Sequence, residues 1–168
     1  MTVARLAAVV AGALGTALAA AAAAPSSTSL VSYRLVGLGK PLPAQIGSGP
    51  CRQGRTSFVI AGSSGRRVGT AHLCVLTIAK VEDSSGVLRR IVQTVREIDS
   101  LPTGAIVSRQ RQVFTFSRDG RRSSAGFRGR VAGGTGRYAR ARGTLSGGGP
   151  TVDGVANWRI TVRLRIGK

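Results

Sequence analysis

The fold of this 168-residue chain is decided by one stretch near its end, Ala156-Asn157-Trp158-Arg159-Ile160-Thr161-Val162-Arg163-Leu164-Arg165-Ile166. Its even-numbered residues are apolar, and its odd-numbered residues are polar or basic. Side chains that alternate in this way lie on opposite faces of an extended strand, whereas a helix would give a period of 3.6. The stretch therefore predicts a long β-strand with one buried face.

Working back from this strand, seven further segments have the composition of strands, and turn-forming residues separate them. The expected strands cover residues 30–38, 55–61, 68–81, 87–98, 105–116, about 125–131 and about 139–145, before the eighth at 156–166. No segment after residue 24 has a helical period. Eight strands joined mainly by short turns predict an all-β fold, an eight-stranded antiparallel β-barrel, although a two-sheet sandwich fits the spacing nearly as well.

Alternation also divides the side chains of earlier strands between two faces. In the segment 30–38, Tyr33 and Leu35 share one face with Val31. In the segment 87–98, Val92 and Ile98 alternate with Gln93 and Glu97, so that the even-numbered residues form the apolar face.

The first 24 residues have the pattern of a signal peptide. One positive charge at Arg5 precedes an apolar run from Leu6 to about Ala19, and small residues follow up to Pro25. The run is short and rich in Ala, which disfavours a membrane span; an uncleaved N-terminal anchor is the alternative. We expect residues 1–24 to be a signal peptide, 25–54 a first strand with a Gly/Pro-rich loop, and 55–168 the remainder of one barrel domain. The mature protein is then expected to be secreted and extracellular, with no later membrane span.

Secretion makes the two cysteines informative, because disulfides persist in oxidising compartments. Cys51 and Cys74 are an even pair, and a single disulfide between them is the default expectation. The alternative is that Cys74 is a free thiol buried between strands, because it stands in the apolar run Leu73-Cys74-Val75-Leu76.

Composition excludes several classes of site. The chain has 25 Lys and Arg against 6 Asp and Glu, and its single imidazole is His72. Two cysteines and one histidine cannot make a four-ligand zinc site without carboxylates, so no metal is expected. The excess charge would attract polyanions, but aromatic residues for base stacking are only 4% of the chain, and no specific nucleic-acid partner is expected.

A family resemblance rests on the stretch Val131-Ala132-Gly133-Gly134-Thr135-Gly136-Arg137-Tyr138-Ala139-Arg140-Ala141-Arg142-Gly143. It resembles the GGTG-x-[FY]-x-x-A-[RY]-G signature of the allene oxide cyclase and dirigent proteins. Residues 67–76 resemble the R-[IV]-G…LC-[IV]-L strand of the cyclases, and Gly104-Ala105-Ile106 is a weaker match. The matches are collinear from about residue 55 to 168, and the family fold is an eight-stranded antiparallel barrel, which favours the barrel over the sandwich.

The resemblance implies a container for a small molecule without a metal or organic cofactor. Allene oxide cyclases steer the ring closure of an apolar epoxide, and dirigent proteins impose stereochemistry on phenolic intermediates with acidic residues and an Arg in the pocket. The segment 30–36 lacks the acidic residue that both families carry in this strand.

The resemblance also places Cys74 toward the lumen, and parity then sends His72, Leu76 and Ile78 inward with it. The expected ligand-binding residues are Cys74, Leu76, Tyr138, Arg142 and Trp158, and the catalytic candidates are His72 and Arg142. The alternatives are a structural role for His72, a solvated position for Arg142 and a core position for Trp158.

Two classes of function follow. The first is a secreted barrel that binds an apolar or phenolic small molecule in its lumen, with cofactor-free cyclisation, isomerisation or stereoselective coupling as its chemistry. The second is a non-catalytic, cationic protein that binds the cell envelope or another polyanion. We also expect a homo-oligomer, a trimer, because Ile106 and Phe114 on one face of a strand and Val107 and Val113 on the other are all apolar.

Overall fold

The structure is a computed structural model that describes residues 27–41, 51 and 53–167. These residues form eight strands and one short 3-10 helix, η1. The bounds are β1 (Ser27–Pro41), β2 (Arg55–Ala61), β3 (Arg67–Glu82), β4 (Leu88–Leu101), β5 (Gly104–Phe116), β6 (Arg122–Gly134), η1 (Gly136–Tyr138), β7 (Ala141–Val152) and β8 (Val155–Ile166). The expected signal segment lies outside the described residues, as does most of the expected loop after β1.

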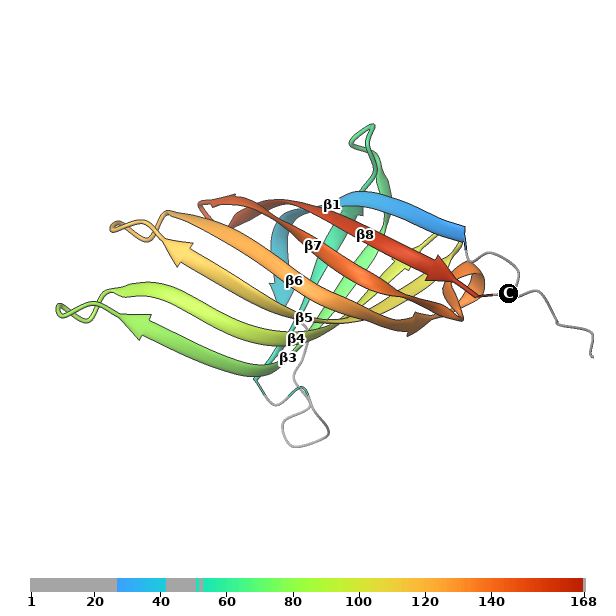
Figure 1. The fold of residues 1–168 in the computed structure, drawn as a ribbon. Coiled ribbons are helices and arrows are strands. Elements are labelled where there is room, and N and C mark those ends of the chain that lie inside the picture. The colour runs from blue at the N-terminus through green and yellow to red at the C-terminus, as the bar shows by residue number, and fades with distance from the viewer. Residues whose placement is uncertain (1–26, 42–50, 52, 168) are drawn as a thin grey trace, which may run out of the picture.

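The strands form one closed antiparallel barrel in sequence order (Figure 1). The barrel closes where β1 pairs with β8, with Val31 opposite Val162 and Tyr33 opposite Ile160. This closure confirms the eight-stranded barrel and excludes the two-sheet sandwich. It also satisfies the backbone groups that an open sheet would leave unpaired at its edges.

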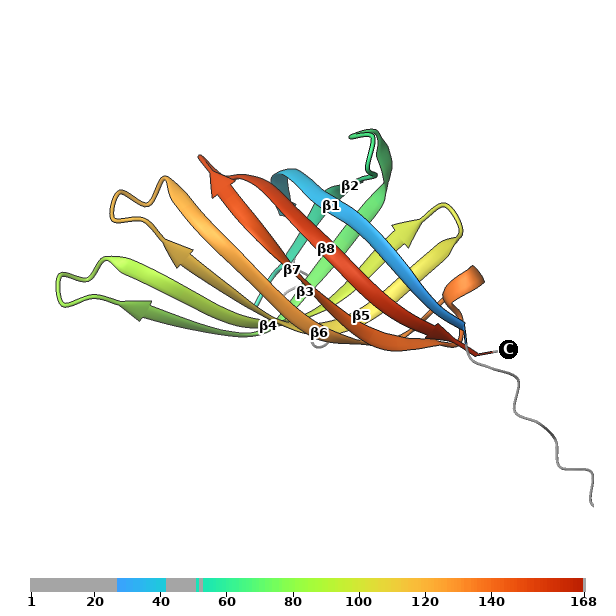
Figure 2. The same ribbon diagram turned by 45° about the horizontal axis from the view of Figure 1, so that its top comes forward.

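The two ends of the barrel differ. At one end η1 and the C-terminal end of β8 lie close together, on the right of Figure 1 (Figure 2 gives a second view). At the other end the β3–β4, β5–β6 and β7–β8 hairpins extend beyond the barrel, and the last six residues of β3 are exposed. We call these the η1 end and the hairpin end.

Alternate side chains of the strands point into the interior. On β8 the buried residues run from Ala156 through Trp158 to Leu164, as the sequence pattern predicts. Tyr33 and Leu35, which share one face of β1, are buried. On β4, Val95, Glu97 and Asp99 face inward, and the even-numbered residues, which include the apolar Val92 and Ile98, face outward.

The strand expected at about 139–145 is longer in the structure and extends to Val152. Gly147, Gly148 and Gly149 belong to β7 and pair with β6 and β8. Their lack of a side chain is required, because a Cβ on Gly147 would lie 2.2 Å from the carbonyl oxygen of Arg159. Glycine here permits close approach of two backbones instead of marking a turn.

The structure confirms the disulfide between Cys51 and Cys74, whose Cα atoms are 5.0 Å apart. It ties the segment before β2 to the outer side of β3. Among the described residues, no helix is long and apolar enough to span a membrane. In the same part of the chain, no three His, Cys, Asp or Glu side chains are grouped so that they could hold a metal ion.

Candidate functional site

A cavity of about 300 Å³ enters the barrel from the hairpin end. Its walls are mainly apolar, and a few polar side chains converge in it. The lining residues discussed below are Phe58, Leu73, Gln93, Gln112, Phe114, Ser123, Thr151 and Trp158.

Aromatic side chains form one wall of the cavity. The ring of Trp158 lies 4.9 Å from that of Phe58, 5.6 Å from that of Phe114 and 5.1 Å from that of Phe127. The indole Nε1 of Trp158 donates a hydrogen bond to Oγ1 of Thr151 at 3.0 Å. This bond satisfies the one polar group of the indole and fixes its ring plane, so the wall is rigid and apolar.

Two glutamines provide a polar group on the opposite side of the cavity. Gln93 on β4 and Gln112 on β5 are cross-strand partners, and Nε2 of Gln93 donates to Oε1 of Gln112 at 2.7 Å. Among the hydrogen bonds of the described residues, none uses Nε2 of Gln112. That amide group can therefore donate to a ligand oxygen.

Below the glutamines lies a buried pair of carboxyl groups. Glu97 and Asp99 on β4 are each 1% exposed. Nε2 of Gln110 donates to Oε2 of Glu97, and the hydroxyl of Tyr33 donates to Oδ2 of Asp99. The other oxygen of each carboxyl group, Oε1 of Glu97 and Oδ1 of Asp99, is buried and has no hydrogen-bond partner among the described residues. Leu73, which lines the cavity, is the cross-strand neighbour of Glu97.

The buried environment favours the protonated, neutral forms of Glu97 and Asp99. Burial raises the pKa of Glu97 well above its usual value, and the negative charge of Asp99 raises it further. Burial also raises the pKa of Asp99, although its interaction with Glu97 and the hydrogen bond from Tyr33 oppose the shift. Burial and the two nearby carboxylates raise the pKa of Tyr33. The site therefore keeps a proton on the pair at pH values where an exposed carboxyl group is ionised.

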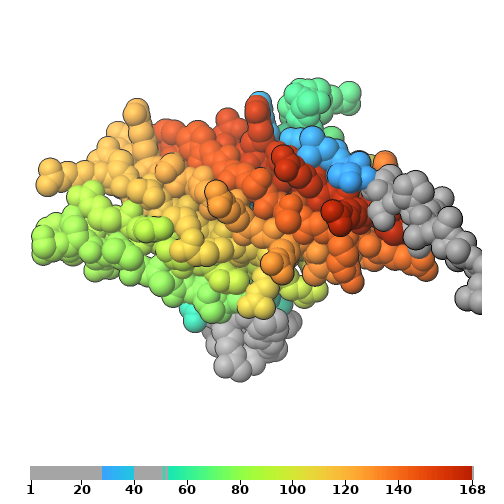
Figure 3. Space-filling view, viewed as in Figure 1, coloured from blue at the N-terminus to red at the C-terminus, as the bar shows by residue number. Residues whose placement is uncertain are grey.

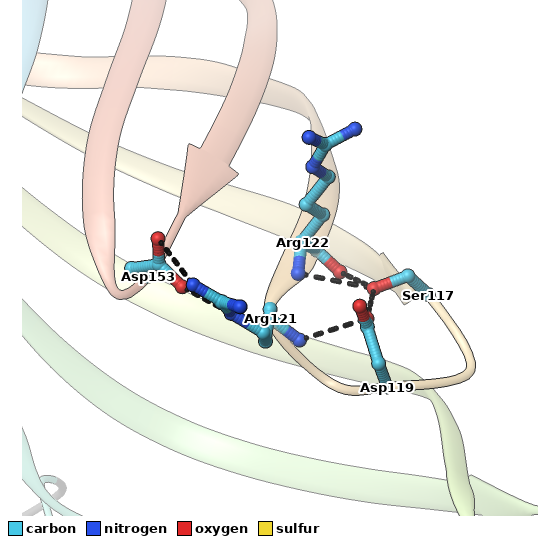
Figure 4. Close-up of polar contacts among 5 residues, drawn as sticks. All are labelled: Ser117, Asp119, Arg121, Arg122 and Asp153. Carbon is cyan, nitrogen blue, oxygen red and sulfur yellow. Dashed lines mark hydrogen bonds and ion pairs between the residues drawn. The ribbon is translucent and has the colours of Figure 1, made fainter.

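At the mouth of the cavity, a cluster of polar side chains connects two turns (Figure 4). Arg121 in the β5–β6 turn forms an ion pair with Asp153 in the β7–β8 turn, with 2.9 Å between Nε and Oδ1. Within the first turn, Ser117 donates to Asp119 at 2.6 Å and accepts from the backbone N–H of Arg122 at 3.0 Å. Ser123 and Thr151 of the cavity wall follow and precede these turns, so the cluster sets the position of the rim.

Comparison with known proteins finds similarity in structure and none in sequence. The fold is similar to the solved structure of a pterocarpan synthase dirigent protein, with a TM-score of 0.32 and 10% sequence identity over 88% of this chain and 89% of that chain. No protein-family model and no curated protein matches the sequence.

The expected ligand-binding residues are divided between the cavity and other parts of the fold. Trp158 lines the cavity, as expected. Tyr138 is buried in η1 at the other end of the barrel, where its hydroxyl accepts a hydrogen bond from Oγ1 of Thr103 at 3.2 Å. Its ring therefore helps to close the η1 end and is not part of the cavity wall.

The predicted inward direction of Cys74 and His72 was wrong, and Leu76 does not line the cavity. Ala71, Leu73 and Val75 are the buried residues of β3, so His72 and Cys74 lie on the outer face. Leu76 lies at a bulge, where the register with β4 shifts between Val75 and Thr77, and it does not line the cavity. Beyond the bulge the register changes, and Ile78 is the cross-strand partner of the cavity residue Gln93, but it is 38% exposed on the projecting hairpin.

Arg142, an expected ligand-binding residue and catalytic candidate, lies on the outside of the barrel. Arg142 is exposed on β7, opposite Arg165, because Ala141 occupies the neighbouring inward position. Its Nη1 donates to the carbonyl oxygen of Ala132 and, at 3.1 Å, to that of Ala141. Arg142 therefore bridges β6 and β7 on the outside, and neither catalytic candidate, His72 or Arg142, reaches the cavity.

Sequence reasoning missed the polar residues of the interior, namely Glu97, Asp99, Ser108, Gln110 and Gln112. The available signal was their spacing, because two of only six acidic residues stand two apart on one strand. The next strand repeats the pattern at three alternate positions. Burying such groups is unfavourable unless they pair with one another, and a spacing of two on adjacent strands allows that pairing.

Proposed function

We propose that this protein binds an apolar or phenolic small molecule in the cavity at the hairpin end. The observation that carries the proposal is an aromatic wall opposite a polar pair, in a cavity of about 300 Å³. This volume lies at the lower end of the range for small-molecule sites, which are mostly apolar with a few convergent polar groups. A ring would pack on Trp158 while its oxygen accepts a hydrogen bond from Gln112.

The chemistry we propose is control of stereochemistry without a cofactor, by stereoselective coupling, cyclisation or isomerisation. A ligand held between a fixed aromatic wall and a hydrogen-bonding amide exposes one face to a reaction partner. The protonated carboxyl pair below the cavity can hold a proton near the ligand at neutral pH. No step of this proposal uses His72 or Arg142, because both side chains lie outside.

The second class of function, a cationic protein without a small-molecule site, is less well supported. It predicts a lumen plugged by large side chains, whereas the hairpin end is open to the cavity. We further propose that the protein is secreted. Support for this comes from the N-terminal pattern of the sequence and from a disulfide that suits an oxidising compartment.

The binding proposal can be tested with a matched pair of variants on β6. Ser123 lines the cavity, and Ser124 is exposed on the opposite face of the same strand. Ser123→Phe fills the cavity near its mouth, and Ser124→Phe adds the same side chain outside. The fluorescence of Trp158, the only tryptophan, reports titration with monolignol-like phenols and fatty acids.

We expect saturable binding to wild type and to Ser124→Phe that changes little with salt. Binding to Ser123→Phe should fall by about tenfold or more, equivalent to about 1.4 kcal/mol. Arg142→Ala should bind as wild type does, because the arginine is outside. Equal affinity of the two Phe variants, or binding that disappears at moderate salt, would contradict the proposal.

A further inference from the structure

The outer wall of the barrel carries a dense group of arginines that the cavity does not use. The wall formed by β5 to β8 faces the viewer in Figures 1 and 3. We define the arginine band as six exposed residues of β4, β5, β6 and β8: Arg96, Arg109, Arg111, Arg128, Arg130 and Arg163.

The strand register brings these arginines into rows. Arg96 lies opposite Arg109, and Arg109 lies opposite Arg130. The row continues through Thr144 on β7 to Arg163 on β8. One step along the strands, Arg111 lies opposite Arg128 in a second row.

Nothing in the described structure neutralises this charge. No ion pair involves a band residue in the described part of the chain. Two of the six acidic residues are inside the barrel, and the other four, Glu82, Asp83, Asp119 and Asp153, are in or beside the turns of the hairpin end. Like charges directly opposite each other on neighbouring strands destabilise a sheet, so the band carries a cost that a bound polyanion would relieve.

The surface of the wall is hollowed next to the band. Two hollows of about 500 and 310 Å³ share Arg128 and Ser146 in their linings. Arg111 borders the first and Arg163 the second. Between the arginines the hollows are lined by glycines and by hydroxyl side chains, including Gly126, Gly129, Gly147, Thr144 and Thr161.

We propose that this wall binds an acidic polysaccharide, with the arginine band pairing with successive carboxylates of the polymer. A guanidinium group forms a bidentate pair with a carboxylate. The hydroxyls of Thr144 and Ser146 can bond to sugar hydroxyls, and neighbouring strands about 4.8 Å apart place these groups at a spacing comparable to one sugar ring.

The composition of the wall favours a polysaccharide over other polyanions. All seven aromatic side chains are buried or half-buried, and none lies on the outer face of the band, so nucleic-acid bases have no stacking surface there. None of the large hydrophobic side chains exposed in the described residues belongs to β4, β5 or β6, so the band offers no anchor for insertion into lipid.

The test compares two double variants of equal charge. Arg109→Gln/Arg130→Gln removes the centre of the band, and Arg66→Gln/Arg67→Gln removes two exposed arginines beside the β2–β3 turn. Polygalacturonate, single-stranded DNA of matched charge and phosphatidylglycerol vesicles serve as probes at near-physiological salt. Thr144→Val tests the hydroxyl contact.

We expect polygalacturonate to bind wild type more tightly than DNA or vesicles do. The band variant should lose about tenfold or more in affinity because charge-assisted pairs are lost, while the turn variant changes less than about twofold. Thr144→Val should weaken binding of polygalacturonate and leave that of DNA unchanged. Equal losses in both double variants, tighter binding of DNA or vesicles, or no binding to polygalacturonate would overturn the proposal. Filling the cavity with Ser123→Phe should not affect this binding, so the two proposals can fail separately.

Discussion

At the scale of single residues, the interior of the barrel is defined by a few polar groups in an apolar surrounding. Glu97 and Asp99 are buried beside each other, and Tyr33 and Gln110 each donate to one of them. Isolated charges at such depth would be very costly, so protonation and the two donors are what make the arrangement tolerable. The same arrangement gives the site its proton at neutral pH.

This pair predicts a pH-dependent effect of Glu97→Gln on stability. Folding raises the pKa of Glu97. The contribution of Glu97 to the free energy of unfolding is therefore fully present below about pH 4 and is lost as the pH rises through the raised pKa. The amide has no such titration and can still bond to Gln110 and Asp99. The melting temperature of the variant should therefore rise relative to that of wild type as the pH increases above the ordinary pKa of a glutamate, by about 4 °C for each kcal/mol relieved.

The control for this titration is Glu82→Gln, which removes an exposed carboxyl group at the end of β3. The difference in melting temperature between this variant and wild type should stay constant over the same pH range. If the difference in melting temperature between Glu97→Gln and wild type were also constant with pH, the buried pair would not bind protons as described.

At the scale of elements, the GGTG stretch acts through close backbone contacts. A Cβ on Gly134 would lie 1.9 Å from the carbonyl oxygen of Ala105 and 2.9 Å from Cβ of Tyr138. Gly104, with φ of +137°, meets the same turn from β5. The glycines therefore allow β5, β6 and η1 to close one end of the barrel.

This contact predicts that Gly134→Ala is strongly destabilising. Overpacking of this kind costs about 1–3 kcal/mol and should lower the midpoint of denaturant unfolding. Gly126→Ala on the same strand is the control, because a Cβ there meets nothing within 4 Å, and its effect should stay within about 0.5 kcal/mol. Equal midpoints for the two variants would contradict the role assigned to Gly134.

The disulfide acts between elements as well. It joins the segment before β2 to β3 and closes a loop with a sequence separation of 23. Replacing both cysteines, Cys51→Ser/Cys74→Ser, should cost about 3 kcal/mol by the chain-entropy relation. Reductant should lower the unfolding midpoint of wild type to that of the double variant, and a midpoint unaffected by reductant would count against a closed bond.

At the scale of the whole molecule, the sequence predicted the architecture better than the site. Alternation in β8 is long and unbroken, and it gave the strand, its buried face and, with seven similar segments, the barrel. The site depends on which face of β3 and β4 turns inward. That choice follows from pairing between strands, and in β4 apolar side chains such as Val92 and Ile98 face outward while Glu97 faces inward.

Those outward apolar residues bear on assembly, which stays a prediction. Val92 lies opposite Val113, and Ile98 lies opposite Val107, on the outer face of β4 and β5. We expect self-association, as a trimer, through this half-buried apolar surface. Because Arg96 and Arg109 of the arginine band lie between the two pairs, self-association and polysaccharide binding should compete for this surface. Higher salt should favour self-association by screening the repulsion between the arginines. Sedimentation at tens of micromolar that finds only a monomer at every salt concentration would contradict this expectation.

The central claim is that the cavity at the hairpin end is the ligand site, and nuclear magnetic resonance tests it most directly. Titration with a monolignol-like phenol should shift the indole N–H of Trp158 and the side-chain amides of Gln93 and Gln112, which line the cavity. The Nε–H signals of Arg111 and Arg128 on the outer wall should stay in place. Shifts confined to the arginines, with the indole and amide signals unchanged, would contradict the claim.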